Sequence, residues 1–115
     1  MATNPMHESS YLILTALVEA PRHGYAILDE VRRLSDGRVE LRAGTLYAAL
    51  DRLRVEGLVE VDREEQVQSR FRRYYRLTES GALRLAEEST RLRHNADAAW
   101  LRLRRAGLLP QGGAA

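Results

Sequence analysis

The fold of this 115-residue chain is decided by the stretch RAGTLYAALDRL, residues 42–53. Its apolar residues recur at steps of three and four, which predicts an amphipathic helix with one face packed against the rest of the chain. These residues are Leu46, Ala49, Leu50 and Leu53. The opposite face is free to meet a partner and carries Thr45, Ala48, Asp51, Arg52 and Val55, with Tyr47 at its edge. Gly57 is well placed to cap this helix at its C-terminal end.

A hairpin is predicted directly after this helix. Leu58, Val59 and Val61 indicate a strand, residues 63–69 are almost entirely polar and predict the hairpin tip, and residues 70–77 predict the return strand. A helix followed by two antiparallel strands is the second half of a winged helix-turn-helix, so this fold is expected.

Upstream of residue 42, the first predicted helix covers about residues 9–20, because apolar residues recur there at helical spacing. Ser9 or Ser10 is the expected N-terminal cap. Pro21 is expected to end the helix, because the residue before a proline avoids helical dihedral angles.

A second helix is predicted from Tyr25 to Leu34, and Asp36-Gly37 is expected to stop it. The segment 38–41 alternates between polar and apolar residues. It therefore predicts a short strand that pairs with the hairpin.

A long helix is predicted at the C-terminal end, opened by Thr78 or Ser80 and continuing to about Arg105, roughly 40 Å in length. It carries a heptad seam made of Leu85, Ser89, Leu92, Ala96, Ala99 and Leu103. The part of the chain before this helix is too small to cover it, so the apolar stripe of the helix is expected to meet a second chain.

The expected fold class is α+β, mainly α: a winged helix-turn-helix with a long C-terminal dimerisation helix. The expected division is a frayed N-terminus at 1–8, the winged domain at 9–78, the dimerisation helix at 79–106 and a flexible tail at 107–115.

Composition narrows the functional classes. The chain has no cysteine, a net charge of +2, and eighteen arginines with no lysine. Its longest apolar run, Tyr11–Val18, is far below the roughly 20 residues that span a bilayer. A soluble, cytoplasmic protein without a disulfide framework is expected.

Catalytic motifs are missing from the sequence. It contains no phosphate-binding glycine loop, no HExxH and no cysteine pair, and no two of His7, His23 and His94 have metal-ligand spacing. The adjacent carboxylates at 64–65 and 87–88 are expected to be solvated charges. We therefore expect no enzyme, no cofactor and no metal site.

The segment 70–76, RFRRYYR, is the most informative for function. In a strand, Arg70, Arg72 and Tyr74 point to one face, whereas Phe71, Arg73 and Tyr75 point to the other. Such a strand could simply use its charge to block edge pairing. Its position after a helix with a free face instead favours phosphate binding.

Four motifs together resemble the PadR family of bacterial transcriptional regulators, over about residues 10–90. They are His23-Gly24-Tyr25, Gly44-Thr45-Leu46-Tyr47, Glu56-Gly57-Leu58-Val59 and the run Arg73-Tyr74-Tyr75-Arg76-Leu77-Thr78-Glu79-Ser80-Gly81. The sequence departs from the family pattern at Ala43 and Ala48, where proline or serine and then proline are frequent, and its hairpin lacks the usual paired glycines.

The resemblance implies a repressor that binds an inverted-repeat operator in double-stranded DNA as a homodimer, with the helix near Gly44 in the major groove and the hairpin on the flanking backbone or minor groove. The predicted DNA contacts are Tyr25, Arg42, Thr45, Tyr47, Ala48, Arg70, Arg72, Arg73 and Tyr74, with Arg52 added from the free helix face. Core packing is the alternative for Tyr25 and Tyr75.

The resemblance also implies dimerisation through the first and last helices. The predicted interface residues are Leu12, Leu85, Leu92, Ala96, Ala99, Trp100 and Leu103. Some family members bind flat aromatic effectors against the last helix, and here Leu92 and Trp100 are the candidate ligand-binding residues. Trp100 alternatively anchors the interface.

Two other functions are also compatible with the sequence. One is a winged protein-interaction module that does not read DNA, and the other is a flavin- or drug-binding protein in which DNA binding is secondary. The basic hairpin argues against the interaction module, because protein docking does not need that charge.

Overall fold

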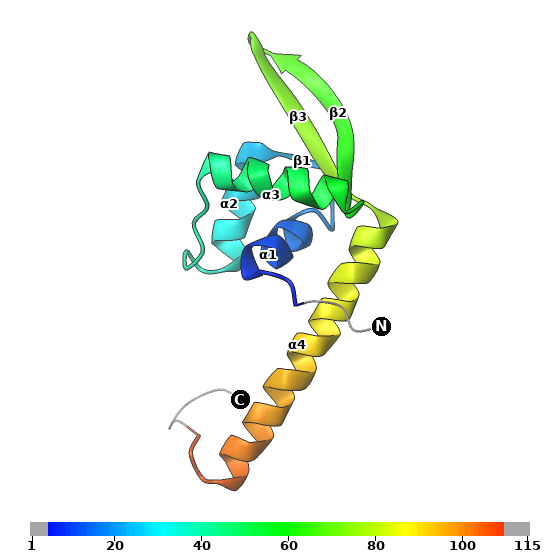
Figure 1. Ribbon diagram of the computed structural model, residues 1–115. Coiled ribbons are helices and arrows are strands. Elements are labelled where there is room, and N and C mark those ends of the chain that lie inside the picture. The colour runs from blue at the N-terminus through cyan, green and yellow to red at the C-terminus, as the bar shows by residue number, and fades with distance from the viewer. Residues whose placement is uncertain (1–4, 110–115) are drawn as a thin grey trace.

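The structure, a computed structural model, describes residues 5–109. In chain order its elements are α1 (Glu8–Ala16), β1 (Arg22–His23), α2 (Gly24–Leu34), α3 (Ala43–Val55), β2 (Val59–Val67), β3 (Arg70–Leu77) and α4 (Glu79–Arg105). The three strands form one antiparallel sheet in the order β1-β3-β2. This is the expected winged helix-turn-helix with a long last helix (Figure 1).

The core lies where α1, α2 and α3 pack together beneath the sheet. All four apolar residues predicted for the buried face of α3 are indeed buried, and they meet Ile13 of α1, Ile27 of α2 and Tyr75 of β3. Gly57 ends α3 as predicted: its φ is +77°, and the following Leu58 N–H donates to the Leu53 carbonyl at 2.9 Å.

The predicted end of the first helix is wrong, because α1 stops at Ala16 rather than near residue 20. The Ala16 carbonyl accepts a hydrogen bond from Arg22 Nε at 2.7 Å instead of from a continuing helix. The predicted caps are also wrong, because His7 occupies the cap position and makes no side-chain cap bond. Ser10 is buried and its hydroxyl accepts from Arg52.

The short strand predicted at 38–41 does not form. The third strand is β1, in which Arg22 pairs with Tyr75 and His23 pairs with Tyr74. Segment 38–41 is a loop held from both sides: the Val39 N–H donates to Ser35 Oγ at 2.9 Å, and Arg38 forms an ion pair with Glu8 at 2.5 Å.

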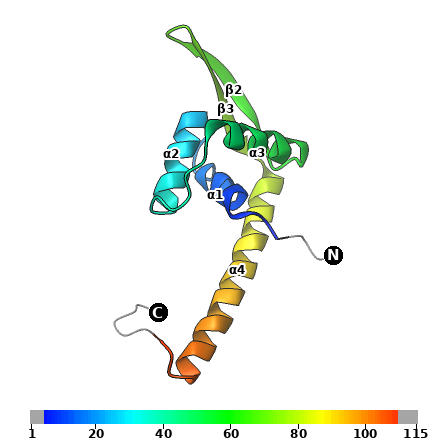
Figure 2. The ribbon, with the colours of Figure 1, turned by 60° about the vertical axis from the view of Figure 1, so that its left-hand side comes forward.

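The wing, which we define as β2, β3 and their turn, is longer than predicted. The residues predicted as a loop at 63–69 mostly continue β2, and only Gln68 and Ser69 form the turn. Both have positive φ, 49° and 66°, as tight two-residue hairpin turns require. A register shift between Val61 and Arg63 bends the wing. The wing projects beyond the head, by which we mean the part of the molecule formed by α1, α2, α3 and β1 (Figures 1 and 2).

Helix α4 starts and ends as predicted. Thr78 is the cap, and its hydroxyl accepts from the Gly81 N–H at 2.9 Å. The C-terminal half of α4 extends away from the head, on the opposite side from the wing (Figure 1). The molecule therefore measures 59 × 35 × 22 Å, and its radius of gyration of 17.1 Å exceeds the roughly 13 Å of a compact chain of this length.

The ends of the chain are described only in part. The expected fraying of residues 1–8 is not met at 5–8, where the Met6 N–H donates to Glu88 and Glu8 pairs with Arg38. Residues 1–4, and residues 110–115 of the predicted tail, lie outside the described range. Within residues 5–109, no helix combines the length and apolar character needed to cross a membrane.

Candidate nucleic-acid interface

The N-terminal half of α3 presents a continuous exposed face. Arg42 precedes the helix, and Thr45, Tyr47 and Ala48 follow on its outer side, all exposed. Their exposure follows from the leucine stripe, because burying one face of a helix leaves the other in solvent. The described structure records no ion pair for Arg42, so its charge is available to an anion.

Tyr47 is positioned by a glycine on the neighbouring helix. A Cβ atom placed on Gly24 would lie 2.2 Å from the Tyr47 hydroxyl oxygen and 2.9 Å from the adjacent ring carbon. Only a residue without a side chain at position 24 lets the ring lie there. Tyr47 nevertheless remains 45% exposed, so the hydroxyl end of its ring lies against Gly24 while much of the side chain stays open to solvent.

The wing carries five arginines, and neighbouring carboxylates already neutralise three of them. Arg63 pairs with Asp62 and Glu65, Arg73 with Glu64, and Arg76 with Glu60. Across residues 5–109, no ion pair within 4.0 Å involves Arg70 or Arg72. Arg70 and Arg72 point to the same face of β3, so that face carries the uncompensated charge.

Tyr74 belongs to the base of the wing. The Arg63 guanidinium lies 3.9 Å from the centre of its ring, and His23 meets the ring edge-on at 5.3 Å. Tyr74 is half-buried between these neighbours. Burial, and then the positive charge of Arg72, lower the pKa of His23 and so favour its neutral imidazole form.

A hollow of about 120 Å³ lies between the head and the wing. Its lining joins the start of α2, the start of α3 and the outer part of β3: His23, Gly24, Tyr25, Tyr47, Arg70, Phe71, Arg72 and Arg73. Half of the ten predicted DNA contacts therefore gather around one concave surface. Tyr25 is 73% exposed, so core packing is wrong for Tyr25, whereas it is right for Tyr75, which is 2% exposed.

Arg52 is not part of this surface. It comes from the last turn of α3, and one of its Nη atoms donates to Ser10 Oγ on α1 at 2.9 Å. The helix-face argument placed Arg52 beside Thr45 and Ala48, but the long side chain turns back toward α1. It lines a different hollow, with Met6, Leu53 and Arg84.

The predicted dimer residues divide into two groups. Leu85 is buried and Leu12 half-buried in the core of their own chain, so Leu85 is not available to a partner, contrary to the prediction. On the projecting part of α4, Leu92, Ala96 and Ala99 are exposed, and Trp100 and Leu103 are half-buried. Leu92 and Trp100 are eight residues apart, roughly 12 Å along the helix, so one chain does not bring them together as a ligand site.

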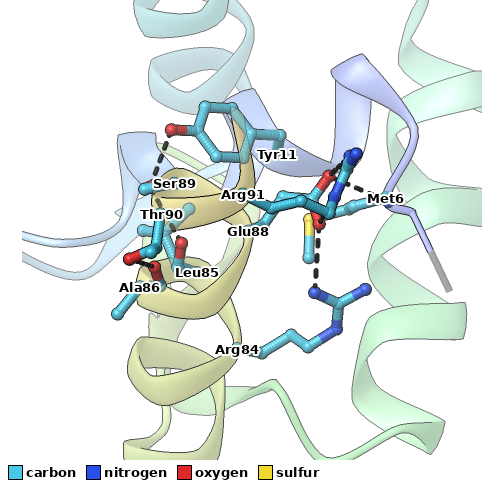
Figure 3. A network of polar contacts seen from close by, with 9 residues as sticks. All are labelled: Met6, Tyr11, Arg84, Leu85, Ala86, Glu88, Ser89, Thr90 and Arg91. Atoms are coloured by element: carbon cyan, nitrogen blue, oxygen red, sulfur yellow. Dashed lines mark hydrogen bonds and ion pairs between the residues drawn. The ribbon is translucent and has the colours of Figure 1, made fainter. Parts of the chain in front are cut away.

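Two features of the structure were not predicted from the sequence. The first is Phe71, which lines the hollow at 68% exposure. The position of Phe71 between two arginines was the sequence signal that could have identified it as a candidate site residue. The second is Glu88, which was grouped with solvated charges but is only 3% exposed. It is contacted by Arg84, Arg91 and the backbone of Met6 (Figure 3). Met6 and Glu88 are 82 positions apart, and a local sequence pattern does not predict contacts at that separation.

No group of three or more metal-binding side chains is found within residues 5–109. The chemistry of the hollow is that of a basic and aromatic surface. Arginines with free charge bind phosphates, and exposed aromatic rings pack against sugars and bases.

Residues 13–87 match the family described as "Transcriptional regulator PadR-like family". Among solved structures, a PadR family transcription regulator from hypervirulent Clostridium difficile R20291 is 28% identical with a TM-score of 0.71, and the match covers 84% of this chain and 99% of that one. A PadR family transcriptional regulator from Eggerthella lenta is 31% identical with a TM-score of 0.67, covering 82% and 80% of the two chains.

A further similar structure is Bacillus subtilis PadR in complex with operator DNA. It is 25% identical with a TM-score of 0.60, and the match covers 68% of this chain and 45% of that one.

Proposed function

Because the chain belongs to the PadR-like family of transcriptional regulators, we propose that it is a sequence-specific DNA-binding repressor that acts as a homodimer on an inverted-repeat operator. The observation that carries this proposal is the hollow between α3 and the wing, where Tyr25, Tyr47 and the uncompensated Arg70 and Arg72 converge. The operator DNA in the Bacillus subtilis PadR structure adds support.

The exposed half of α3 is the proposed major-groove reader. The major groove of B-DNA admits an α-helix, and hydroxyl and methyl groups at the start of such a helix reach base edges. Thr45 and Ala48 offer these groups, and Tyr47 offers a hydroxyl beside them. Arg42, directly before the helix, is proposed to bind a phosphate at the edge of the groove.

The wing is the proposed backbone clamp. Arg70 and Arg72 are proposed to contact phosphates, because their charges are not already used within the hairpin. Arg73 is also near the hollow, but its ion pair with Glu64 at 2.9 Å offsets its charge. We therefore expect Arg73 to contribute less to binding than its two neighbours, and Tyr74 to brace the wing.

Dimerisation is proposed through the projecting half of α4. Its exposed Leu92, Ala96 and Ala99 continue in heptad steps to Leu103. Pairing this seam with a second copy covers apolar side chains that a single chain leaves in water. It also holds two copies of α3 at a fixed separation.

Salt dependence tests the proposal on DNA from the region upstream of the protein's own gene. Each phosphate that an arginine neutralises contributes about one unit to the slope of log K against log salt. We expect Arg72→Ala to lower this slope by about one, and Arg73→Ala, its neighbour with a partner in Glu64, to leave the slope nearly unchanged. An unchanged slope and affinity for Arg72→Ala would remove Arg72 from the interface.

Two further hypotheses, a protein-interaction module and release by a small-molecule effector, are tested separately. Absence of any gel shift at low salt, where electrostatic binding is strongest, would favour the protein-interaction module over a DNA reader. Release by a small-molecule effector at Leu92 and Trp100 stays a prediction. Micromolar binding of a planar dye, followed by the dye's own fluorescence and lost in a Trp100→Ala dimer, would support it.

A further inference from the structure

Phe71 is an aromatic residue that the fold does not account for. It is the only phenylalanine in the chain and is 68% exposed, whereas Tyr75, on the same face of β3, is 2% exposed and ties the strand to the core. Across the ribbon Phe71 is paired with the polar Gln66. Removing the ring would therefore take nothing from the core.

The position of Phe71 is well defined. It follows the turn at Gln68 and Ser69 by two residues and stands between Arg70 and Arg72. Strand alternation sends the two arginines to one face of the wing and Phe71 to the other. Phe71 lines the same hollow as Tyr47, and Tyr75, on the same face of β3 as Phe71, is buried in the core, so the ring is on the side of the wing that faces the helices.

This inference rests on the proposed function. If α3 enters the major groove, the sugar–phosphate strand that separates the two grooves would run along the concave surface between α3 and the wing. The outer part of the wing then lies at the adjacent minor groove. Arg70 and Arg72 on one face would meet phosphates, and the apolar ring on the other would meet sugars and base edges.

We propose that Phe71 is a specificity-determining residue that enters the minor groove beside the site read by α3 and packs against deoxyribose and an adjacent base step. Apolar side chains inserted in this way partly unstack a step, and pyrimidine–purine steps such as TA and CA/TG yield most easily. Phe71 therefore makes the protein select a deformable step at a position where no side chain forms a hydrogen bond to a base.

Charge favours DNA as the occupant of this surface over another protein or a second copy of this chain. The ring is flanked in sequence by Arg70 and Arg72, which form no ion pair with any residue of the described range 5–109, and a third arginine, Arg73, lines the same hollow. A polyanion satisfies these charges and still offers the apolar edge of its sugars to Phe71.

The test is selection of binding sites from randomised duplex DNA by the full chain and by Phe71→Ala. We expect both proteins to select the same central motif, because α3 is unchanged, and only the wild type to enrich a pyrimidine–purine step in the flank. Identical flanks for both proteins would overturn the role of Phe71 and leave the proposed function intact. Failure of the wild type to select any motif would overturn both.

Affinity on the selected site supplies a second readout. Phe71→Ala should weaken binding by about tenfold, as expected for losing one aromatic contact to DNA, with an unchanged salt slope because no phosphate contact is lost. Leu83→Ala, at a side chain of α4 that is 65% exposed and lies outside both the hollow and the heptad seam, is the control and should bind like the wild type.

Unstacking can be observed directly with 2-aminopurine placed at the flanking step. Its fluorescence should rise when the wild type binds and stay low with Phe71→Ala at saturating protein. An equal rise with both proteins, or no rise with the wild type, would contradict insertion of the ring.

Discussion

Gly24 and Tyr47 form the contact on which the geometry of the proposed reading surface depends most. They come from α2 and α3, and the tyrosine hydroxyl occupies the space that a side chain at position 24 would fill. The contact uses the far end of an exposed side chain, so it contributes little to stability. Its role is to fix the direction of Tyr47.

Gly24→Ala tests this role. The added methyl group should push Tyr47 outward and weaken DNA binding by at least fivefold, while the free energy of unfolding changes by less than about 1 kcal/mol, the usual scale of a Gly-to-Ala exchange in a helix. Binding anisotropy and urea denaturation measure the two effects.

The control for this prediction is the same substitution in a Tyr47→Ala background. Without the ring there is nothing to displace, so Gly24→Ala should then leave the remaining affinity unchanged. An equal loss in both backgrounds would show that Gly24 acts independently of Tyr47.

At the scale of elements, the segment before α1 is fastened to α4 by Glu88. The carboxylate lies under Arg91 and Arg84 of its own helix and accepts the Met6 N–H at 3.3 Å (Figure 3). The hydrogen bond from Arg91 is the main cause that lowers the pKa of Glu88, to about 2, and the Met6 N–H adds to it against the opposing effect of burial. At the next residue of α4, the Tyr11 hydroxyl meets Ser89 Oγ at 2.7 Å.

Glu88→Gln should destabilise the protein at neutral pH by about 1–3 kcal/mol, because charged hydrogen bonds are replaced by weaker ones in a buried position. The folded-state pKa of Glu88 lies below the ordinary value of 4.5. Its stabilisation is therefore fully present above pH 4.5 and is lost as the pH falls toward 2. Urea denaturation should show the two proteins converging below pH 4.5, and a constant difference down to pH 3 would contradict the assignment.

Elements set by local pattern could be predicted from the sequence. The leucine stripe of α3, its cap at Gly57 and the Thr78 cap of α4 each depend on residues a few positions apart. The end of α1 and the third strand could not, because Arg22 and His23 are held by β3, about fifty residues away. The wing was underestimated because both faces of its outer part are in water, where polar residues suit a strand as well as a loop.

The candidate site could be predicted in its residue types more than in its arrangement. The arginine-rich strand identified the wing, but not which arginines carry free charge, because that depends on the pairing of Glu64 with Arg73 across the ribbon. The position of Arg52 could not be predicted for the same reason, because its hydrogen-bond partner Ser10 lies on another helix.

At the scale of the whole molecule, a chain of contacts connects the reading helix to α4. Arg52 ties α3 to α1 through Ser10, and α1 is tied to α4 through Tyr11 and Ser89. In the proposed dimer, the distance between the two copies of α3 would therefore be set by how the two α4 helices pair, because these hydrogen bonds fix α3 and α1 relative to α4. A rigid spacing is what an inverted-repeat reader needs.

The most direct measurement is a hydroxyl-radical footprint on the upstream DNA, made with the wild type and with Leu103→Asp, whose monomeric state sedimentation would verify. We predict two protected patches for the wild type, with centres one helical turn, about 34–36 Å, or a whole multiple of it apart. The monomeric variant should protect these patches only at much higher concentration. A wild-type protein that protects no patch at low salt, or one patch only, would contradict a dimer that reads DNA with two copies of α3 and the wing.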